Sequence, residues 1–258
     1  MKIQSILGTL ATLWCISSYS AELDRASVEK LLTNTNGIDK PADLRRKDLT
    51  DLDLSSLDFT HADLWGSDLR RANLSNSNLS GLNLDLTVMT KINLTGANLA
   101  NTSIFGVHMG GANLSNANLS KSRFIANLDR SKLNNANLTQ ADWGVDMKNQ
   151  PMGLMRVSLN NVDLSGADLT DANLNRALLR QANLTGSTLR NTVLFGADLS
   201  GADFTNADLS GADLSGTNLT DANFTGATLT GTRFTGATEK SLLKGLETAK
   251  NLNSAIFK

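Results

Sequence analysis

Aspartates recur at a fixed spacing near the C-terminal end of the chain. The stretch GADLSGADFTNADLSGADLSG, residues 196–216, carries a carboxylate in each group of five residues, at Asp198, Asp203, Asp208 and Asp213. Carboxylates can hold a metal ion or serve as acid and base groups when they converge on one point. The repeat that surrounds these four side chains therefore decides whether they can meet.

Other residue types that support catalysis are scattered. His61 and His108 have no Cys or Glu cluster beside them, so the sequence predicts two isolated surface histidines. Many Ser and Thr residues recur, but none has a recognisable base and orienting partner. We therefore predict that the protein is not an enzyme and has no metal site and no cofactor.

An apolar residue recurs every five positions through most of the chain. If this residue is numbered i, Asp or Asn is most frequent at i−1, Ser or Thr at i+1, and Gly, Asn or Asp at i+2. The centres run over residues 44–124, continue one residue early over 128–143, and return to the first spacing over 154–234. None of the 38 centres is polar, so the period reflects structure rather than composition.

A period of five fits neither the 3.6 of a helix nor the 2.0 of a long strand. It fits a short extended piece, in which i−2 and i point inward and i−1 points outward, followed by two turn residues. Half of the inward i−2 positions are Ala, which predicts a thin, filled core without a cavity. The aspartates at i−1 then point outward on successive sides and do not converge.

The segment ADLSGADFTNADLSGADLSGTNLTDANFTG, residues 197–226, resembles the pentapeptide-repeat family, and the resemblance extends over about residues 42–236. It implies an all-β solenoid, a right-handed four-sided (quadrilateral) β-helix with four units per coil. Because burying one Leu yields roughly 1.5–3 kcal/mol while ordering five backbone residues costs about 5–10 kcal/mol, stability must come from stacking the coils.

Short helical caps are predicted at both ends of the solenoid. Residues 21–41 contain an amphipathic stretch with an apolar face, formed by Val28, Leu31 and Leu32. Residues 237–258 are predicted to be helical as well, with four side chains that cover the last coil: Leu242, Leu243, Leu246 and Ala249.

The repeat over residues 42–236 is interrupted near 125–128 and near 146–151, and we predict a loop at the second interruption. Lys47 occupies an inward i−2 position, where burial of its charge is costly. This substitution predicts an open or irregular first coil.

Residues 1–20 have the pattern of a secretory signal peptide. Lys2 precedes an apolar run over residues 6–16, and small residues follow at Ser18 and Ser20. The run is shorter than the roughly 20 residues that a spanning helix needs. We predict cleavage after Ser20 or Ala21, no membrane span in the mature chain, and a periplasmic or secreted protein. The alternatives are an uncleaved membrane tether and a frayed N-terminus of a cytoplasmic protein.

The resemblance brings a second functional class, because the family includes proteins that mimic DNA and bind gyrase. Duplex DNA carries about one charge per 1.7 Å. Residues 161–236 carry eight Asp and four Arg, but residues 82–160 carry four Asp against seven Lys and Arg. No continuous DNA-like charge is present, so a gyrase-binding or gyrase-protecting DNA mimic is the alternative to an exported module.

Apolar residues replace Ser or Thr at three i+1 positions that are multiples of 20 apart. Trp65, Phe105 and Ile125 would lie on one side of the rod, with Asp85 between the first two. An exposed apolar strip often marks a contact surface, and local packing is the alternative. We predict that this strip, with Asp146 and Lys148 of the loop, binds a protein partner or a second copy.

A row of hydroxyl groups suggests one further class. The row is formed by Ser165, Thr185, Thr205 and Thr225. Ice binding usually requires paired threonine rows, and this one is mostly single.

Taken together, these features of the sequence predict an exported, non-enzymatic protein-binding or structural module, with no nucleic acid expected as a partner.

Overall fold

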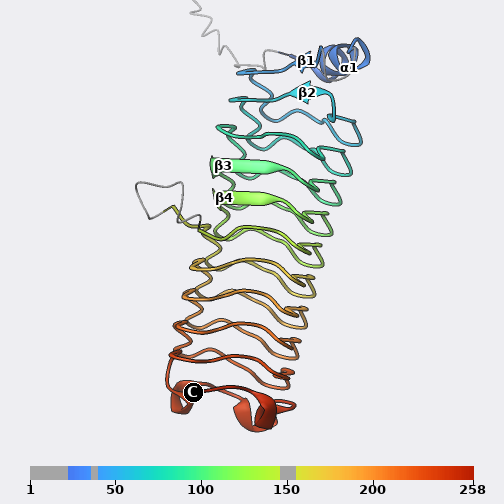
Figure 1. Cartoon of the computed structure of the whole chain (residues 1–258). Coiled ribbons are helices and arrows are strands. Elements are labelled where there is room, and N and C mark those ends of the chain that lie inside the picture. Colours follow the sequence, from blue (N-terminus) through green and yellow to red (C-terminus); the bar gives the residue numbers. More distant parts are fainter. Residues whose placement is uncertain (1–22, 36–39, 146–154) are drawn as a thin grey trace, which may run out of the picture.

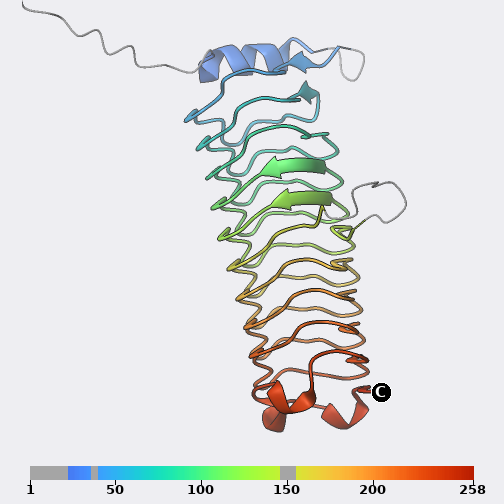
Figure 2. The same ribbon diagram turned by 90° about the vertical axis from the view of Figure 1, so that its left-hand side faces the viewer.

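The computed structural model describes residues 23–35, 40–145 and 155–258. They form a long rod of stacked coils, with helix α1 (Arg25–Thr33) at one end and the C-terminal segment at the other, as Figures 1 and 2 show. The predicted signal peptide, residues 1–20, lies outside the described residues.

Each coil pairs in parallel with the coil that follows it in the chain. Strand β1 (Ala42–Asp43) pairs with β2 (Ala62–Asp63), which begins one full coil later. Strand β3 (Ser103–His108) pairs in the same way with β4 (Arg123–Asn127). All four lie on one side of the rod, which we call the strand face; its core centres are Leu44, Leu64, Leu84, Ile104 and Phe124.

The core is a continuous column of inward side chains. The Leu and Phe centres of the described repeats are buried, and so are the Ala residues between them. At most inward positions taken by Ser or Thr, the hydroxyl donates to the carbonyl three residues earlier, as from Ser67 to Leu64 at 2.7 Å and from Thr87 to Leu84 at 2.6 Å. At the others, Ser131, Thr192 and Thr232, it donates to a carbonyl of the preceding coil. These bonds satisfy polar groups that would otherwise be costly to bury.

The first interruption of the repeat shortens one coil by a single position. Asn113 pairs with Lys132, whereas the regular register, seen where Asn93 pairs with Asn113, would bring it opposite the next residue, Leu133. The aromatic rings of Phe124 and Trp143 stack with their centroids 4.7 Å apart in this region, and the Trp143 indole N–H donates to Ser122 at 3.0 Å. Large rings thus fill the core where the repeat slips.

The second interruption lengthens one coil by more than the sequence predicted. Asn127 pairs with Ser158, a much longer step along the chain than the regular one from Ser158 to Leu178. The backbone pairing makes Leu159 the first core centre after Trp143 among the described residues. The predicted loop at 146–151 and the predicted centre Leu154 lie outside the described residues.

Helix α1 covers the first coil. Asp24 is its N-cap and accepts a hydrogen bond from the Ser27 amide at 2.8 Å. Val28 is buried, and the guanidinium of Arg25 donates to the carbonyls of Asp53 and Ser55 at 3.0 and 3.1 Å. These bonds attach the helix to the exposed backbone of the terminal coil.

The prediction of an irregular first coil was wrong. Ala42 pairs with Ala62 and Asp48 pairs with Asp68 in the ordinary way, although Lys47 lies between them. Lys47 is only half-buried. Its aliphatic stem can cover the core edge while the ammonium group stays near water.

The C-terminal segment, which was predicted to be helical, forms a further coil whose helical parts are single 3-10 turns. Lys244, Lys250 and Ile256 pair with the preceding coil, and each follows a single-turn 3-10 helix: η2 (Lys240–Leu242), η3 (Leu246–Thr248) and η4 (Leu252–Ser254). Because backbone pairing sets the side-chain directions, Leu243 and Leu246 are buried, whereas Leu242 is exposed. Phe257 stacks on Phe234 and helps to close the core.

Candidate partner-binding site

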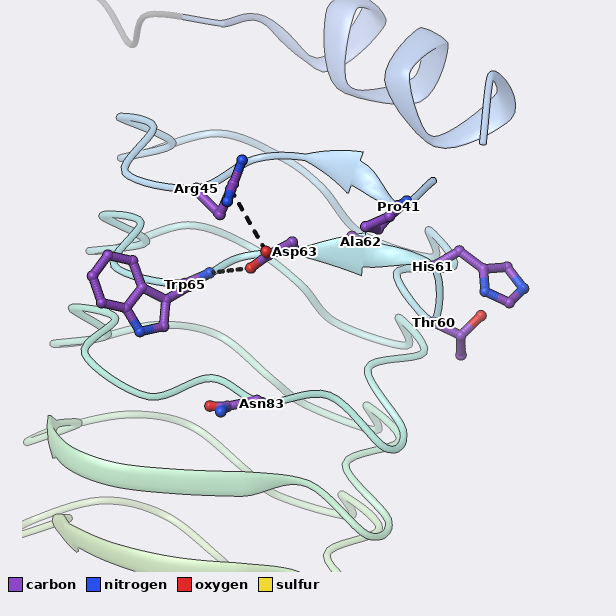
Figure 3. Close-up of a pocket in the computed structure, with 8 residues that line it drawn as sticks. All are labelled: Pro41, Arg45, Thr60, His61, Ala62, Asp63, Trp65 and Asn83. Atoms are coloured by element: carbon purple, nitrogen blue, oxygen red, sulfur yellow. Dashed lines mark hydrogen bonds and ion pairs between the residues drawn. The ribbon is translucent and has the colours of Figure 1, made fainter. Parts of the chain in front are cut away.

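Trp65 and Phe105 stand on the strand face at positions where the repeat usually has Ser or Thr. The Trp65 amide donates to the Asp63 carboxylate at 3.1 Å, and the Phe105 amide donates to the Asp85 carboxylate at 2.8 Å. These bonds fix the backbone at both positions. The Trp65 ring points away from the coil in Figure 3 and is half-buried, and Phe105 is 41% exposed.

The prediction that Ile125 belongs to an exposed strip was wrong, because its side chain is only 3% exposed. Ile125 in β4 is the register partner of Phe105 in β3, so the phenyl-bearing strand lies against it on one side. Met155 and Arg156 line the same small hollow on the other side. The remaining predicted site residues, Asp146 and Lys148, lie outside the described residues.

Two apolar residues that the sequence analysis missed extend the exposed surface. Leu86 is 54% exposed, and Val88, two residues further on, is exposed as well. Leu86 lies in the coil between those of Trp65 and Phe105, at a corner that the neighbouring coils fill with Gly66 and Gly106. We call Trp65, Leu86, Val88 and Phe105 the apolar patch.

The backbone of Leu86 makes its presence at this corner unexpected. Its φ angle is 61°, in the left-handed region. Among the described non-glycine residues with a positive φ, Leu86 is the only aliphatic one. That conformation costs an L-residue roughly 1–2 kcal/mol. The departures of Leu86 and Val88 from the repeat pattern were visible in the sequence and could have identified both.

Charged groups border the patch near Trp65. The Arg46 guanidinium lies over the Trp65 ring, 4.9 Å from its centroid. Arg45 bonds the Asp43 carboxylate at 2.9 Å and lies 3.6 Å from that of Asp63. The hydrogen bonds from Arg45 lower the pKa of Asp43 to about 2.

An open hollow of about 470 Å³ runs beside β2 at this end of the rod. Figure 3 shows Trp65 at one end of it and His61 and Thr60 at the other, with Asp63 between them. The Asp63 carboxylate already accepts from the Trp65 amide, and the histidine lies away from it. The lining groups do not converge as a catalytic set would.

The described residues contain no group of three His, Cys, Asp or Glu side chains that could hold a metal ion. His61 and His108 are both exposed. Within the same residues, no helix has the length and apolarity that a membrane crossing requires.

The regularly spaced aspartates have a structural role. Each carboxylate accepts a hydrogen bond from the amide two residues later, as Asp203 does from Thr205 at 2.9 Å. All four are half-buried and pair with the neighbouring coils, and their carboxylates hold the amides at the start of the turns, so they are not merely a solvated surface. At Asp208, partial burial raises the pKa, but hydrogen bonds from Ser210 and Arg190 outweigh it, and the pKa is lowered.

Comparison with protein-family models gives one match along the rod. The model described as Pentapeptide repeats matches in eight copies, over residues 42–71, 53–90, 92–125, 158–196, 172–211 and 197–236. Together these segments cover more than half of the chain. No curated protein matches it.

Solved structures of other chains are similar. HetL, a pentapeptide repeat protein involved in heterocyst differentiation regulation from the cyanobacterium Nostoc sp. strain PCC 7120, is 29% identical, with 91% of this chain and 94% of HetL covered and a TM-score of 0.38. Rfr23 from the cyanobacterium Cyanothece 51142 is 28% identical, with 51% and 91% covered and a TM-score of 0.41. Full-length QnrB1, a plasmid-mediated fluoroquinolone resistance protein, is 19% identical, with 79% and 92% covered and a TM-score of 0.40.

Proposed function

The chain belongs to the pentapeptide repeat family, and from this premise we propose that it is an exported, non-enzymatic module that binds a protein partner through the apolar patch. Proteins of this family form right-handed quadrilateral β-helices and generally act as structural or binding modules. For this chain we propose the same hand and four-sided form, closed at both ends by the caps described above.

The observation that carries the proposal is the apolar patch itself. Trp65, Leu86, Val88 and Phe105 occupy outward positions that the repeat fills mostly with small or polar residues elsewhere. The fold gains little from them there, and Leu86 adopts a backbone conformation that disfavours its side chain. Aromatic residues are enriched in protein interfaces, and clustered exposed apolar residues mark such surfaces.

The patch differs from other exposed apolar residues on the strand face. Phe195 is 46% exposed and occupies the same repeat position as Phe105, further along the rod, and Val193 is exposed beside it. The residues at this position in the coils before and after Phe195 are polar, Asn175 and Ser215. Phe195 therefore serves as a matched control, since it shares the local environment but not the four-residue cluster.

Export is supported by the pattern of residues 1–20, in which a basic residue, a short apolar run and small residues follow one another. Cell fractionation followed by N-terminal sequencing of the mature chain tests this part. A mature chain that begins near residue 21 and is found outside the cytoplasm supports export. An intact N-terminus in the cytoplasm contradicts it.

The distribution of charge does not support the DNA-mimic alternative. Residues 82–160 carry a net charge of +3, since seven Lys and Arg outnumber four Asp, and the patch lies partly within this range. A protein that presents a DNA-like surface needs negative charge along its length. Inhibition or protection of gyrase by the chain that lacks the predicted signal peptide would instead favour that alternative.

The binding proposal is tested by replacing two patch residues together, Trp65→Ser and Phe105→Ser. Affinity purification from the exported fraction, quantified by mass spectrometry, compares this variant with the wild type and with Phe195→Ser. We expect at least one protein to be retained by the wild type and by Phe195→Ser and lost by the double variant. Sedimentation velocity on the same three proteins reports self-association.

The proposal is contradicted if the double variant recovers every protein as well as the wild type does and its oligomeric state is unchanged. The substituted side chains are outside the core, so circular dichroism should show all three proteins folded, with similar melting temperatures.

A further inference from the structure

A second surface feature lies one corner away from the apolar patch. Gly110 and Gly111 follow one another at a corner of the rod, with Lys91 in the preceding coil and Arg130 in the next. These four residues, together with Asp129 and Asn161, line an open hollow of about 410 Å³. The hollow exists because two consecutive positions on this corner have no side chain.

The fold does not require glycine at residue 110. The equivalent position in the preceding coils is Thr90 and Arg70, and in the next coil it is Asp129. A Cβ on Gly110 would approach only the Asp129 carbonyl at 3.7 Å and the Asn127 side chain at 3.9 Å, which are ordinary contacts. Packing therefore does not explain why residue 110 is a glycine, and a functional role can.

Two positive charges border the hollow without a partner among the described residues. Lys91 and Arg130 are exposed, and in that part of the chain neither makes an ion pair or a side-chain hydrogen bond. Arg70 and Arg71, earlier on the same side of the rod, are by contrast paired with Asp68 and Asp51.

The carboxylate within the hollow is already occupied. Asp129 accepts hydrogen bonds from the Ser158 hydroxyl at 2.6 Å and from the Asn160 amide at 2.8 Å. Its charge partly offsets those of Lys91 and Arg130, but one net positive charge remains at the opening. Lys91 and Arg130 are attached two strand spacings apart, about 9.5 Å, so both side chains can reach one anion between them.

We propose that this hollow binds a carboxylate of the protein partner that docks on the apolar patch. The inference rests on the proposed function and gives the partner a chemical description: a segment that places Leu, Phe or similar side chains within a few residues of Asp or Glu. Val88 and Lys91 are three residues apart in one coil, so one short segment can contact both. Charge complementarity of this kind favours one partner over others.

A protein carboxylate fits the surroundings better than a nucleic-acid phosphate. The hollow holds only two cations and one carboxylate, and the exposed Val88 of the apolar patch lies three residues before Lys91, whereas nucleic-acid sites use extended rows of Lys and Arg. The chain as a whole has a net charge of −1, and residues 161–236 carry −4, which would repel a long polyanion.

In the experiment, random dodecapeptides displayed on phage are selected for binding to residues 21–258 of the chain. Enriched peptides are synthesised, and their affinities are measured for the wild type, Gly110→Asp and the double variant Lys91→Gln, Arg130→Gln. Gly110→Asp places a carboxylate of the chain itself in the hollow. Lys121→Gln is the matched control, because Lys121 holds the same repeat position and left-handed backbone on another corner of the rod.

We expect the enriched peptides to combine apolar residues with Asp or Glu. Their affinity should fall at least about tenfold in Gly110→Asp and in the double variant, and also when the peptide Asp or Glu is changed to Asn or Gln. Lys121→Gln should change it less than twofold, and higher salt should weaken binding to the wild type.

The outcomes separate this inference from the proposed function. The same affinities are measured for the patch variant Trp65→Ser, Phe105→Ser. If peptide affinity falls in this variant but not in Gly110→Asp or in Lys91→Gln, Arg130→Gln, the carboxylate site is contradicted and the patch stays supported. If peptide affinity is unchanged in the patch variant, or if the selection returns no peptide, both proposals are contradicted. Binding of a short DNA duplex that is lost in Lys91→Gln, Arg130→Gln would assign the hollow to phosphate and overturn the proposal.

Discussion

The outward aspartates should act through hydrogen bonding and not through charge, and Asp203 offers the sharpest test. One oxygen of its carboxylate accepts from the Thr205 amide at 2.9 Å, from the Thr205 hydroxyl at 2.5 Å and from the Asn223 side chain at 3.2 Å. Asp203→Ala removes this acceptor from all three donors. Asp203→Asn keeps an oxygen in the same place and removes only the charge.

The magnitude follows from these three bonds. A typical intramolecular hydrogen bond contributes about 0.5–1.5 kcal/mol net, and water can replace part of it because Asp203 is half-buried. We expect Asp203→Ala to lower the free energy of unfolding by about 1–3 kcal/mol. Asp203→Asn should change it by less than about 0.5 kcal/mol, because Asn183 and Asn223 accept the equivalent amide hydrogen bonds in the neighbouring coils.

Urea denaturation followed by far-ultraviolet circular dichroism measures both changes from the midpoint and slope of each transition. An Asn variant as unstable as the Ala variant would mean that the negative charge itself matters, and the hydrogen-bond explanation would fail. It would also fail if Asp203→Ala unfolded at the same urea concentration as the wild type.

Three further outcomes are expected. The pKa of Asp43, lowered to about 2 by its hydrogen bonds from Arg45, lies below the ordinary value of roughly 3.9, so the pair stabilises the fold above that value and the gain disappears as the pH falls through 2. Arg45→Gln should return the pKa towards the ordinary value in a nuclear magnetic resonance titration; an unchanged pKa would contradict the assigned cause. Leu114→Ala, in the fully buried core, should lower the free energy of unfolding by about 3–5 kcal/mol in urea denaturation. Leu252→Ala, in the partly buried last coil, should lower it clearly less. Equal losses would argue against a weaker terminal coil. Removal of residues 239–258 uncovers the coil that contains Phe224 and Phe234 and should cause aggregation, which size-exclusion chromatography detects. A truncated chain that stays monomeric, with an unchanged melting temperature, would show that the solenoid needs no cap.

The repeat made the architecture accessible from sequence because one five-residue unit sets both the side-chain direction and the turn. The described centres from Leu44 onwards are buried as the period requires, and a single missing residue after Phe124 is visible as a change in pairing register. The C-terminal end was less accessible. Residues 240–258 have helix-like apolar spacing, but the unpaired backbone of the preceding coil offers hydrogen bonds, and pairing with it replaced the helix.

The candidate site was only partly accessible for a similar reason. Positions one coil apart share a side of the rod, which identified Trp65 and Phe105, but exposure also depends on the next coil. Ile125 is 3% exposed and lines one hollow with Met155 and Arg156, which lie close to the second interruption of the repeat. Leu86 lies at i+2 and not at i+1, so it does not belong to the predicted strip, although an aliphatic residue at i+2 is an equally clear departure from the pattern.

Residue-specific photo-crosslinking tests the apolar patch as a docking surface most directly. A benzophenone amino acid replaces Phe105 in one variant and Phe195 in another, so that both probes stand at the same repeat position and on the same face of the rod. After irradiation in cells that make the protein, we expect a discrete adduct from position 105, absent from position 195, that disappears when Trp65→Ser is added. Identical crosslinking from the two positions, or none from position 105, would contradict the patch as the site of partner binding.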